Sequence, residues 1–226
     1  MLQLVIGNKN YSSWSMRPWV LMKHFGVAFE EIKLRFDFTP GSSFYQELKR
    51  YTPVAKVPVL LIDGFAVWDT LAIAETVAER VPEQALWPRE ALQRARSRSL
   101  CAEMHAGFSA LRSHCPMNIE ASLPAVGARV LAEHEAVRRD LARIDAMWSE
   151  ALTASGGPFL FGGFGIADAY FAPVVARIRT YGLPLSDAAR AYAERVWAAP
   201  GVSHWVADAL AEQDFLDFEE PYRQSR

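Results

Sequence analysis

The pattern of the sequence changes once, near Pro88. Before this residue, short strand-like runs alternate with helical patterns, and after it only helical patterns remain. A chain of 226 residues is long enough for two small domains, each with a core of its own. We therefore expect an α/β domain over residues 1–83 and an all-helical domain over residues 89–226, joined by a linker near 86–89.

The first 83 residues predict a small sheet with helices packed on it. Residues 2–6 are typical of a buried strand, and residues 27–36 are expected to pair with it in parallel through a helix over 15–25. Asp63-Gly64 separates apolar runs at 57–62 and 65–68, which is a strong signal for an antiparallel hairpin. With helices over 40–48 and 71–81, the expected order is β-α-β-α-β-β-α.

In the second domain, proline and glycine residues mark the ends of the predicted helices. These residues leave five helical segments, at about 89–115, 123–153, 166–181, 186–199 and 202–212.

Composition and charge exclude several classes of function. The 24 Lys and Arg residues against 26 Asp and Glu residues give a net charge of −2, so the chain lacks the basic excess of nucleic-acid-binding proteins. No apolar run approaches the roughly 20 residues of a membrane-spanning helix, and the short apolar start does not resemble a signal peptide. We expect a cytoplasmic protein. Cys101 and Cys115 form no Cys-x-x-Cys pair and the histidines are scattered, so reduced cysteines and no metal are expected.

Three motifs fall on successive elements: Tyr11 to Arg17 after the first strand, Lys56-Val57-Pro58 at the third strand, and Trp68-Asp69-Thr70 at the third helix. In combination they resemble the cytosolic glutathione transferases, over nearly the whole chain. The nearest match is the serine-type zeta or maleylacetoacetate-isomerase-like branch and its bacterial relatives. The resemblance implies a thioredoxin-like domain that binds glutathione, a helical domain that holds a second substrate, and a homodimer.

The serines before the first helix are the candidates to hold the glutathione thiolate. A thiol of pKa ~8.5 is only about 3% ionised at pH 7, so the reaction needs groups that stabilise the anion. A hydroxyl at the positive N-terminal end of a helix can do so. Matching Gly26 to the glycine that closes the family's first helix favours Ser12 as the donor. Ser13 stays open as the neighbouring choice and Tyr11 as a third. The alternative is that Ser12 and Ser13 only cap the helix, and for Ser15 capping is the expected role.

The other two motifs are expected to bind the rest of the tripeptide. Val57-Pro58 resembles the family's cis-proline turn, in which the backbone before the proline pairs with the cysteinyl residue. Asp69 and Thr70 are expected to bind the γ-glutamyl ammonium and carboxylate groups, and Asp69 can cap the helix in the same geometry. Lys56 approaches the glycyl carboxylate or points to solvent.

The second substrate is expected to lie against the helical domain. Trp14 stands where zeta-like sequences usually carry a cysteine and is predicted to form a wall of the site. Met104, His105, Phe108 and Arg112 fall near one side of a helix and are candidates for an acceptor pocket. Met104 and Phe108 are favoured, Arg112 could attract an acidic electrophile, and core or surface positions are the alternative for most of the four.

One further motif is structural. Gly165 stands three residues before Asp168, where the family normally carries a Ser or Thr that caps a helix. Glycine is an acceptable N-cap, and Asp168 is expected to accept backbone N–H groups.

The resemblance implies an enzyme that transfers the glutathione thiolate to a small, mostly apolar electrophile. Glutathione is then a cosubstrate, and no metal takes part. Two alternatives stay open. One is glutathione-dependent cis–trans isomerisation of a maleyl-type substrate, and the other is a non-catalytic interaction module with the same fold.

Overall fold

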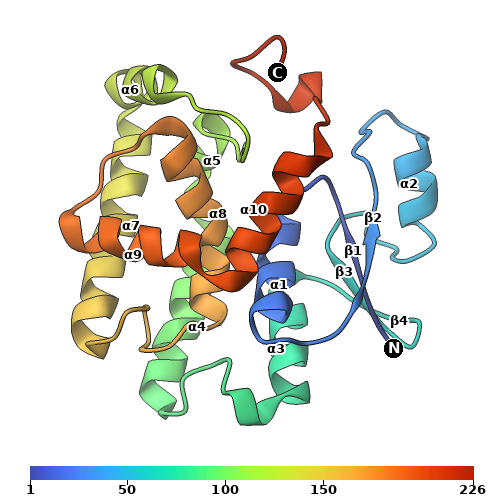
Figure 1. Cartoon of the computed structure of the whole chain (residues 1–226), viewed down its shortest axis with the longest axis horizontal. Helices are drawn as coiled ribbons and strands as arrows, with labels where there is room; N and C mark the ends of the chain where they lie inside the picture. The colour runs from blue at the N-terminus through green and yellow to red at the C-terminus, as the bar shows by residue number, and fades with distance from the viewer.

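The computed structural model describes all 226 residues, with a small sheet at one side of the molecule and a helical domain at the other (Figure 1). The N-terminal elements are β1 (Leu2–Ile6), α1 (Ser13–His24), β2 (Glu30–Lys33), α2 (Ser43–Leu48), β3 (Val59–Ile62), β4 (Phe65–Val67) and α3 (Thr70–Arg80). The short turn η1 (Pro82–Gln84) precedes α4 (Ala91–Ala106), α5 (Ser109–His114), α6 (Pro124–Glu133), α7 (Glu135–Ser155), α8 (Ile166–Tyr181), α9 (Asp187–Ala198), α10 (Pro200–Glu212) and η2 (Asp217–Glu219).

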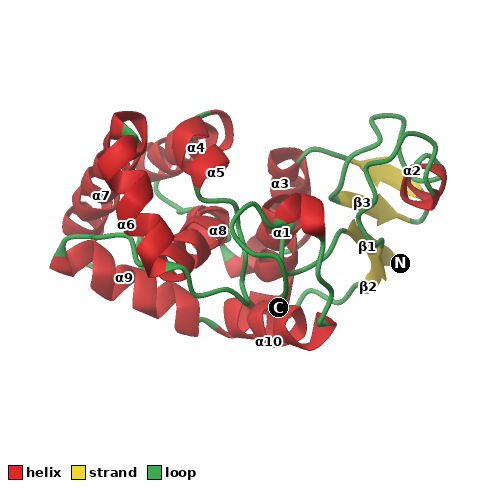
Figure 2. Cartoon of the chain, turned by 90° about the horizontal axis from the view of Figure 1, so that it is seen from above, coloured by secondary structure: helices red, strands yellow, loops and turns green.

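The four strands form one mixed sheet in the order β2-β1-β3-β4. β1 pairs in parallel with β2 and antiparallel with β3, which pairs antiparallel with β4. The hairpin turns at Asp63 and Gly64, both with positive φ (50° and 87°), as a two-residue turn of this kind requires. α1 and α3 cover one face of the sheet and α2 lies on the other (Figure 2). The predicted order and fold class are confirmed.

α1 connects the two domains because its residues 15–22 are all buried. One of its faces packs against the sheet domain and another against α8 and α10. A single apolar cluster of 49 buried residues therefore runs through both domains. Lys9, in the loop before α1, adds a polar link: its carbonyl accepts a hydrogen bond from Trp205 Nε1 (3.0 Å) and its ammonium pairs with Asp208 (2.6 Å). The domain boundary is a packed interface, so its side chains hold fixed positions.

Two of the predicted long helices are broken. The segment expected at 89–115 ends as α4 at Ala106, because Phe108 adopts a left-handed conformation (φ 56°), and restarts as α5. Asp140 of α7 stabilises the new start by accepting the N–H of Leu111 (2.9 Å). The segment expected at 123–153 is interrupted at His134, whose backbone is extended between α6 and α7. Helical periodicity alone does not show these breaks. At the first one, the stabilising group, Asp140, lies on another helix.

The connection between the domains is packed as well. Leu86 and Trp87 are buried, and the Leu86 carbonyl accepts the N–H of Ile166 (3.1 Å) at the start of α8. The second strand is shorter than expected, since only residues 30–33 pair with β1. Cys101 and Cys115 are free and buried, as the sequence predicts. None of the helices combines the length and apolar character needed to cross a bilayer.

Candidate active site

A cavity of about 750 Å³ lies between the two domains. This volume suits a small organic ligand. Its walls come from the loop before α1, the residues before β3, the start of α3, and helices of the second domain. The residues singled out from the sequence that line it are Tyr11, Ser12, Ser13, Trp14, Lys56, Val57, Pro58, Asp69, Thr70, His105 and Arg112.

The N-terminus of α1 opens into this cavity with Ser12 as its cap. Ser12 Oγ accepts the N–H of Ser15 (3.4 Å) and donates to Ser15 Oγ (2.7 Å), which in turn accepts the N–H of Gly7 (3.2 Å). The cap is therefore Ser12, and the expectation that Ser15 fills this role is wrong. Ser15 instead supports Ser12 from the fully buried side of the helix.

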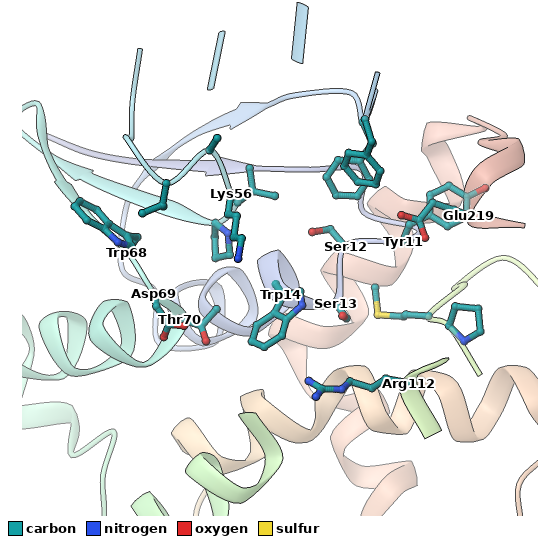
Figure 3. Close-up of a pocket in the computed structure, with 18 of the residues that line it drawn as sticks. Tyr11, Ser12, Ser13, Trp14, Lys56, Trp68, Asp69, Thr70, Arg112 and Glu219 are labelled. Carbon is teal, nitrogen blue, oxygen red and sulfur yellow. The ribbon is translucent and has the colours of Figure 1, made fainter. Parts of the chain in front are cut away.

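The two candidate serines face different parts of the cavity. Figure 3 shows Ser12 turned toward the side where Lys56 lies and Ser13 turned toward Arg112. Ser13 Oγ has no hydrogen-bond partner in the protein, although the residue is only 8% exposed. Tyr11 is engaged elsewhere: its hydroxyl donates to Glu220 (2.7 Å), and burial together with this bond raises its pKa to about 12. Tyr11 is thus a wall residue and not a free donor.

Trp14 lines the cavity and packs between Arg17 and His105. The guanidinium of Arg17 lies 4.1 Å from its ring centroid on one side, and His105 packs edge-on at 4.9 Å. Arg17 is almost fully buried and has no carboxylate partner, and this burial lowers its pKa to about 10. Arg17 stays charged at neutral pH, so Trp14 is held rigidly by cation–π contacts.

The start of α3 presents hydrogen-bonding groups at one end of the cavity (Figure 3). Asp69 is the N-cap: Oδ1 accepts the N–H of Leu71 (2.8 Å), while Oδ2 lies 3.2 Å from His105 Nε2. Burial lowers the pKa of His105, an effect that Asp69 opposes and that nearby Arg17 and Arg112 increase. Thr70 is buried, and its Oγ1 accepts a hydrogen bond from Tyr170 of α8 (3.0 Å).

The peptide bond between Val57 and Pro58 is cis, as the resemblance predicts. It leads directly into β3, which places the Val57 backbone along the cavity edge opposite α1. Lys56 is exposed and makes no ion pair with any protein carboxylate.

On the helical side, two arginines line the cavity. Arg112 donates to the His105 carbonyl (3.2 Å), and Arg177 of α8 donates through Nε to the Cys115 carbonyl (2.9 Å). Neither forms an ion pair with a carboxylate. Burial lowers the pKa of Arg112, and it lowers that of Arg177 to about 10 with help from the charges of Arg17 and Arg112. The helical side of the cavity therefore carries two positive charges that no direct ion pair neutralises.

Met104 and Phe108, the two favoured pocket residues, do not line the cavity. Met104 is fully buried beneath Arg17, whose Nη2 lies 3.4 Å from its sulfur, and Phe108 belongs to the core at the break between α4 and α5. Their predicted role is wrong. Met104 lies on the face of α4 that Arg17 covers, and Phe108 lies at the break after Gly107, where the helix changes direction. The prediction assumed that one continuous helix carries both residues.

About half of the lining was not identified from the sequence. These residues are Phe36, Phe38, Phe44, Tyr45, Val54, Ala55, Trp68, Pro116, Met117, Arg177 and Glu219. Most lie on loops and on the segment after α10, where no periodic pattern marks an inward-facing position. Among them, only Trp68 could have been predicted from the sequence, because it stands next to the Asp69-Thr70 motif.

The fold and cavity define a class: a thioredoxin-like domain with a cis-proline turn, joined to a helical domain across a cleft at the start of α1. Comparison with known families agrees. Residues 11–80 match the family described as glutathione S-transferase, N-terminal domain, and residues 128–208 match the glutathione S-transferase, C-terminal domain. Together these matches cover more than half of the chain, in the expected order. The chain belongs to the glutathione S-transferase family.

Individual relatives agree with this assignment. The chain is 29% identical to a maleylacetoacetate isomerase of Rattus norvegicus over 101 residues, which cover 45% of this chain and 46% of that protein. It is 24% identical to glutathione S-transferase 1 of Dianthus caryophyllus over 82% of this chain and 81% of that one. A Burkholderia glutathione transferase homologue with bound glutathione has the same fold, with a TM-score of 0.70, 24% identity and coverage of 92% and 97%. The chain spans less than half the length of the maleylacetoacetate isomerases that it matches.

Proposed function

We propose that this protein is a glutathione transferase that binds glutathione along the cis-proline turn and attacks an electrophile held by the helical domain. The observation that carries the proposal is the meeting of Ser12, Pro58 and Thr70 in one cavity at two helix N-termini. A peptide paired with the Val57 backbone directs its cysteinyl sulfur toward Ser12. The Burkholderia homologue, whose structure contains glutathione, supports this ligand.

The neighbouring serine supports Ser12 as the thiolate donor. The Ser12 hydroxyl donates to Ser15 Oγ (2.7 Å), and Ser15 Oγ also accepts a hydrogen bond from the N–H of Gly7. When glutathione binds, the two hydroxyls reverse their bond in this proposal, so that Ser15 donates to Ser12 Oγ. The Ser12 proton is then free for the sulfur. A hydrogen bond to a charged group contributes about 1.5–3 kcal/mol, which corresponds to a thiol pKa lower by roughly one to two units. The positive end of α1 adds to this stabilisation.

The test is the pH at which bound glutathione ionises, followed through the ultraviolet absorbance of the thiolate. We expect Ser12→Ala to raise the thiol pKa by about one to two units. Ser15→Ala should raise it by less, since it removes only the support of Ser12. Ser13→Ala is the matched control and should leave the pKa near that of the unsubstituted protein. An unchanged pKa in Ser12→Ala together with a raised one in Ser13→Ala would transfer the role to Ser13.

The positive charge on the helical side of the cavity indicates which kind of second substrate the site prefers. Arg112 and Arg177 have no carboxylate partner, which favours an electrophile that carries an anionic group over a purely apolar one. The same observation and the matched isomerases support the alternative, glutathione-dependent isomerisation of a maleyl-type acid. Analysis of the product of such an acid separates the two, because isomerisation returns free glutathione and conjugation consumes it.

A non-catalytic module is the remaining alternative, and calorimetric titration with glutathione tests it. Absence of binding at millimolar concentration would favour the module. The homodimer, the cytoplasmic location and a reaction without metal remain predictions from the sequence.

A further inference from the structure

The segment after α10 brings one carboxyl group into the cavity. Glu219, the last residue of η2, lines the cavity beside Tyr11, at the end away from Trp68 and Asp69 (Figure 3). Its side chain forms no hydrogen bond and no ion pair with the protein. Glu219 and Asp69 are the only carboxylates in the lining, and Asp69 already caps α3 and contacts His105.

The position of Glu219 is set by its neighbours. The adjacent Glu220 is buried and accepts hydrogen bonds from the Tyr11 hydroxyl (2.7 Å) and from Asn118 Nδ2 (2.9 Å). On the other side, Phe218 packs against Phe38, with ring centroids 5.1 Å apart. The turn is therefore held on both flanks, and the carboxyl group between them has a defined place.

The charges around Glu219 leave it able to exchange a proton near neutral pH. Burial raises its pKa to about 7, the negative charge of Glu220 acts in the same direction, and the positive charge of Arg177 opposes the rise. The Tyr11 hydroxyl beside it is held by Glu220. The other charged or titratable groups in the lining are Arg112, His105, Lys56, Asp69 and Tyr45.

We propose that Glu219 is the proton donor to the carbanion that forms when the glutathione thiolate adds to an activated carbon–carbon double bond. This inference rests on the proposed transferase activity. It narrows the preferred electrophiles to α,β-unsaturated carbonyl compounds.

The step balances without any further reactant. The sulfur forms a bond to the β-carbon, and the π electron pair of the double bond moves toward the carbonyl oxygen to give an enolate. The Glu219 O–H bond then breaks and its proton is transferred to the α-carbon, which leaves the Glu219 carboxylate to be reprotonated from water. Arg177, which lines the same cavity, stabilises the negative charge of the enolate. Substitution of an aryl chloride, by contrast, expels chloride and needs no proton from the protein.

This difference defines the experiment. The variant Glu219→Gln keeps the shape of the side chain and cannot donate a carboxyl proton. We measure kcat for an α,β-unsaturated ketone and for 1-chloro-2,4-dinitrobenzene, both at saturating glutathione. General acid catalysis contributes about 100-fold or more, so we expect a loss of this size with the ketone and a change of less than about two-fold with the aryl chloride.

The pH profile gives a second readout. With the ketone, kcat of the unsubstituted protein should fall as the pH rises through about 7, because the donor loses its proton. Glu219→Gln should lack this fall, and Glu219→Asp should restore part of the rate. Asp217→Asn, at an exposed position in the same turn, is the matched control and should behave like the unsubstituted protein.

Equal losses with both substrates would show a structural role and overturn the inference, as would no loss with either. If the unsubstituted protein acts on the aryl chloride and not on the ketone, this inference fails while the transferase proposal stands. If it acts on neither substrate and binds no glutathione, both fail.

Discussion

The hydroxyl of Tyr170, in the middle of the helical domain, donates a hydrogen bond to Thr70 Oγ1 at the start of α3 (3.0 Å). Both residues are almost fully buried, with exposed fractions of 1% and 2%. Because the Thr70 oxygen accepts this bond, its own proton is left to point into the cavity. The helical domain thus orients a group of the site on the other domain.

This contact predicts a specific loss of glutathione affinity. Tyr170→Phe frees the Thr70 hydroxyl to rotate, so the bond that we expect from Thr70 to the γ-glutamyl carboxylate should weaken. One such bond contributes about 1 kcal/mol, or roughly five-fold in binding. We expect the KM for glutathione to rise by about that factor. The kcat at saturating glutathione should stay within about two-fold.

A glutathione analogue isolates the effect. γ-Aminobutyryl-cysteinylglycine lacks only the α-carboxylate, so its affinity should be the same for Tyr170→Phe and the unsubstituted protein. Tyr222→Phe, which removes a tyrosine hydroxyl bond to the His114 carbonyl, is the control. An equal loss of affinity for glutathione and for the analogue would contradict the assignment.

Gly165 predicts a packing constraint where the family normally has a Ser or Thr. A Cβ atom at this position would lie 2.9 Å from the Leu86 carbonyl oxygen, a backbone atom of the connection between the domains. Overpacking of this kind costs about 1–3 kcal/mol, so Gly165→Ala should lower the free energy of unfolding by that amount.

Chemical denaturation measures this loss, and Gly163→Ala is the matched control because no atom lies within 4 Å of its Cβ. Gly165→Ser should also be destabilised, since a side-chain cap, worth about 1 kcal/mol, does not remove the clash. A Gly165→Ala variant as stable as Gly163→Ala would show that the connection can move.

Asp168 predicts a pH-dependent difference in stability. Its carboxylate accepts the N–H groups of Gly165 (2.9 Å) and Leu160 (3.2 Å) and the hydroxyl of Tyr192 (2.9 Å), but burial dominates and raises its pKa from 3.8 to about 6. The folded protein therefore binds this proton more strongly than the unfolded chain does. The resulting stabilisation is fully present below pH 4 and is lost as the pH rises to about 6.

The variant Asp168→Asn does not titrate at this position, so it is the reference. The unfolding free energy of the unsubstituted protein minus that of the variant should fall between pH 4 and 6, by on the order of 3 kcal/mol, and stay constant above pH 7. Urea denaturation at several pH values measures the difference, with Asp217→Asn as the control. A difference that rises with pH would mean that the three donors outweigh burial.

The sequence by itself determined the features that depend on neighbouring residues. The order of strands and helices in the first domain follows from alternation, helical spacing and Asp63-Gly64, because a turn of this type needs only the two residues that form it. The motifs around Ser12, Pro58 and Asp69 were found for the same reason, since each lies within a few positions of one element end. The cis bond before Pro58 and the cap at Asp69 are confirmed, whereas α1 is capped by Ser12 in place of Ser15, which shows the limit of placing a cap without coordinates.

The tertiary structure decided which distant residues share the cavity. Arg177 and Glu219 lie far from Ser12 along the chain, and their patterns are those of a helix interior and an irregular segment. Phe108 was misplaced because the break before α5 depends on the partner that Asp140 offers from α7, and Met104 was misplaced because Arg17 of α1 covers its face of α4. The spacing of apolar residues along one segment shows only which face of that helix or strand is apolar. The groups that meet across a cavity are set by packing between segments, and the sequence of either segment alone does not contain that information.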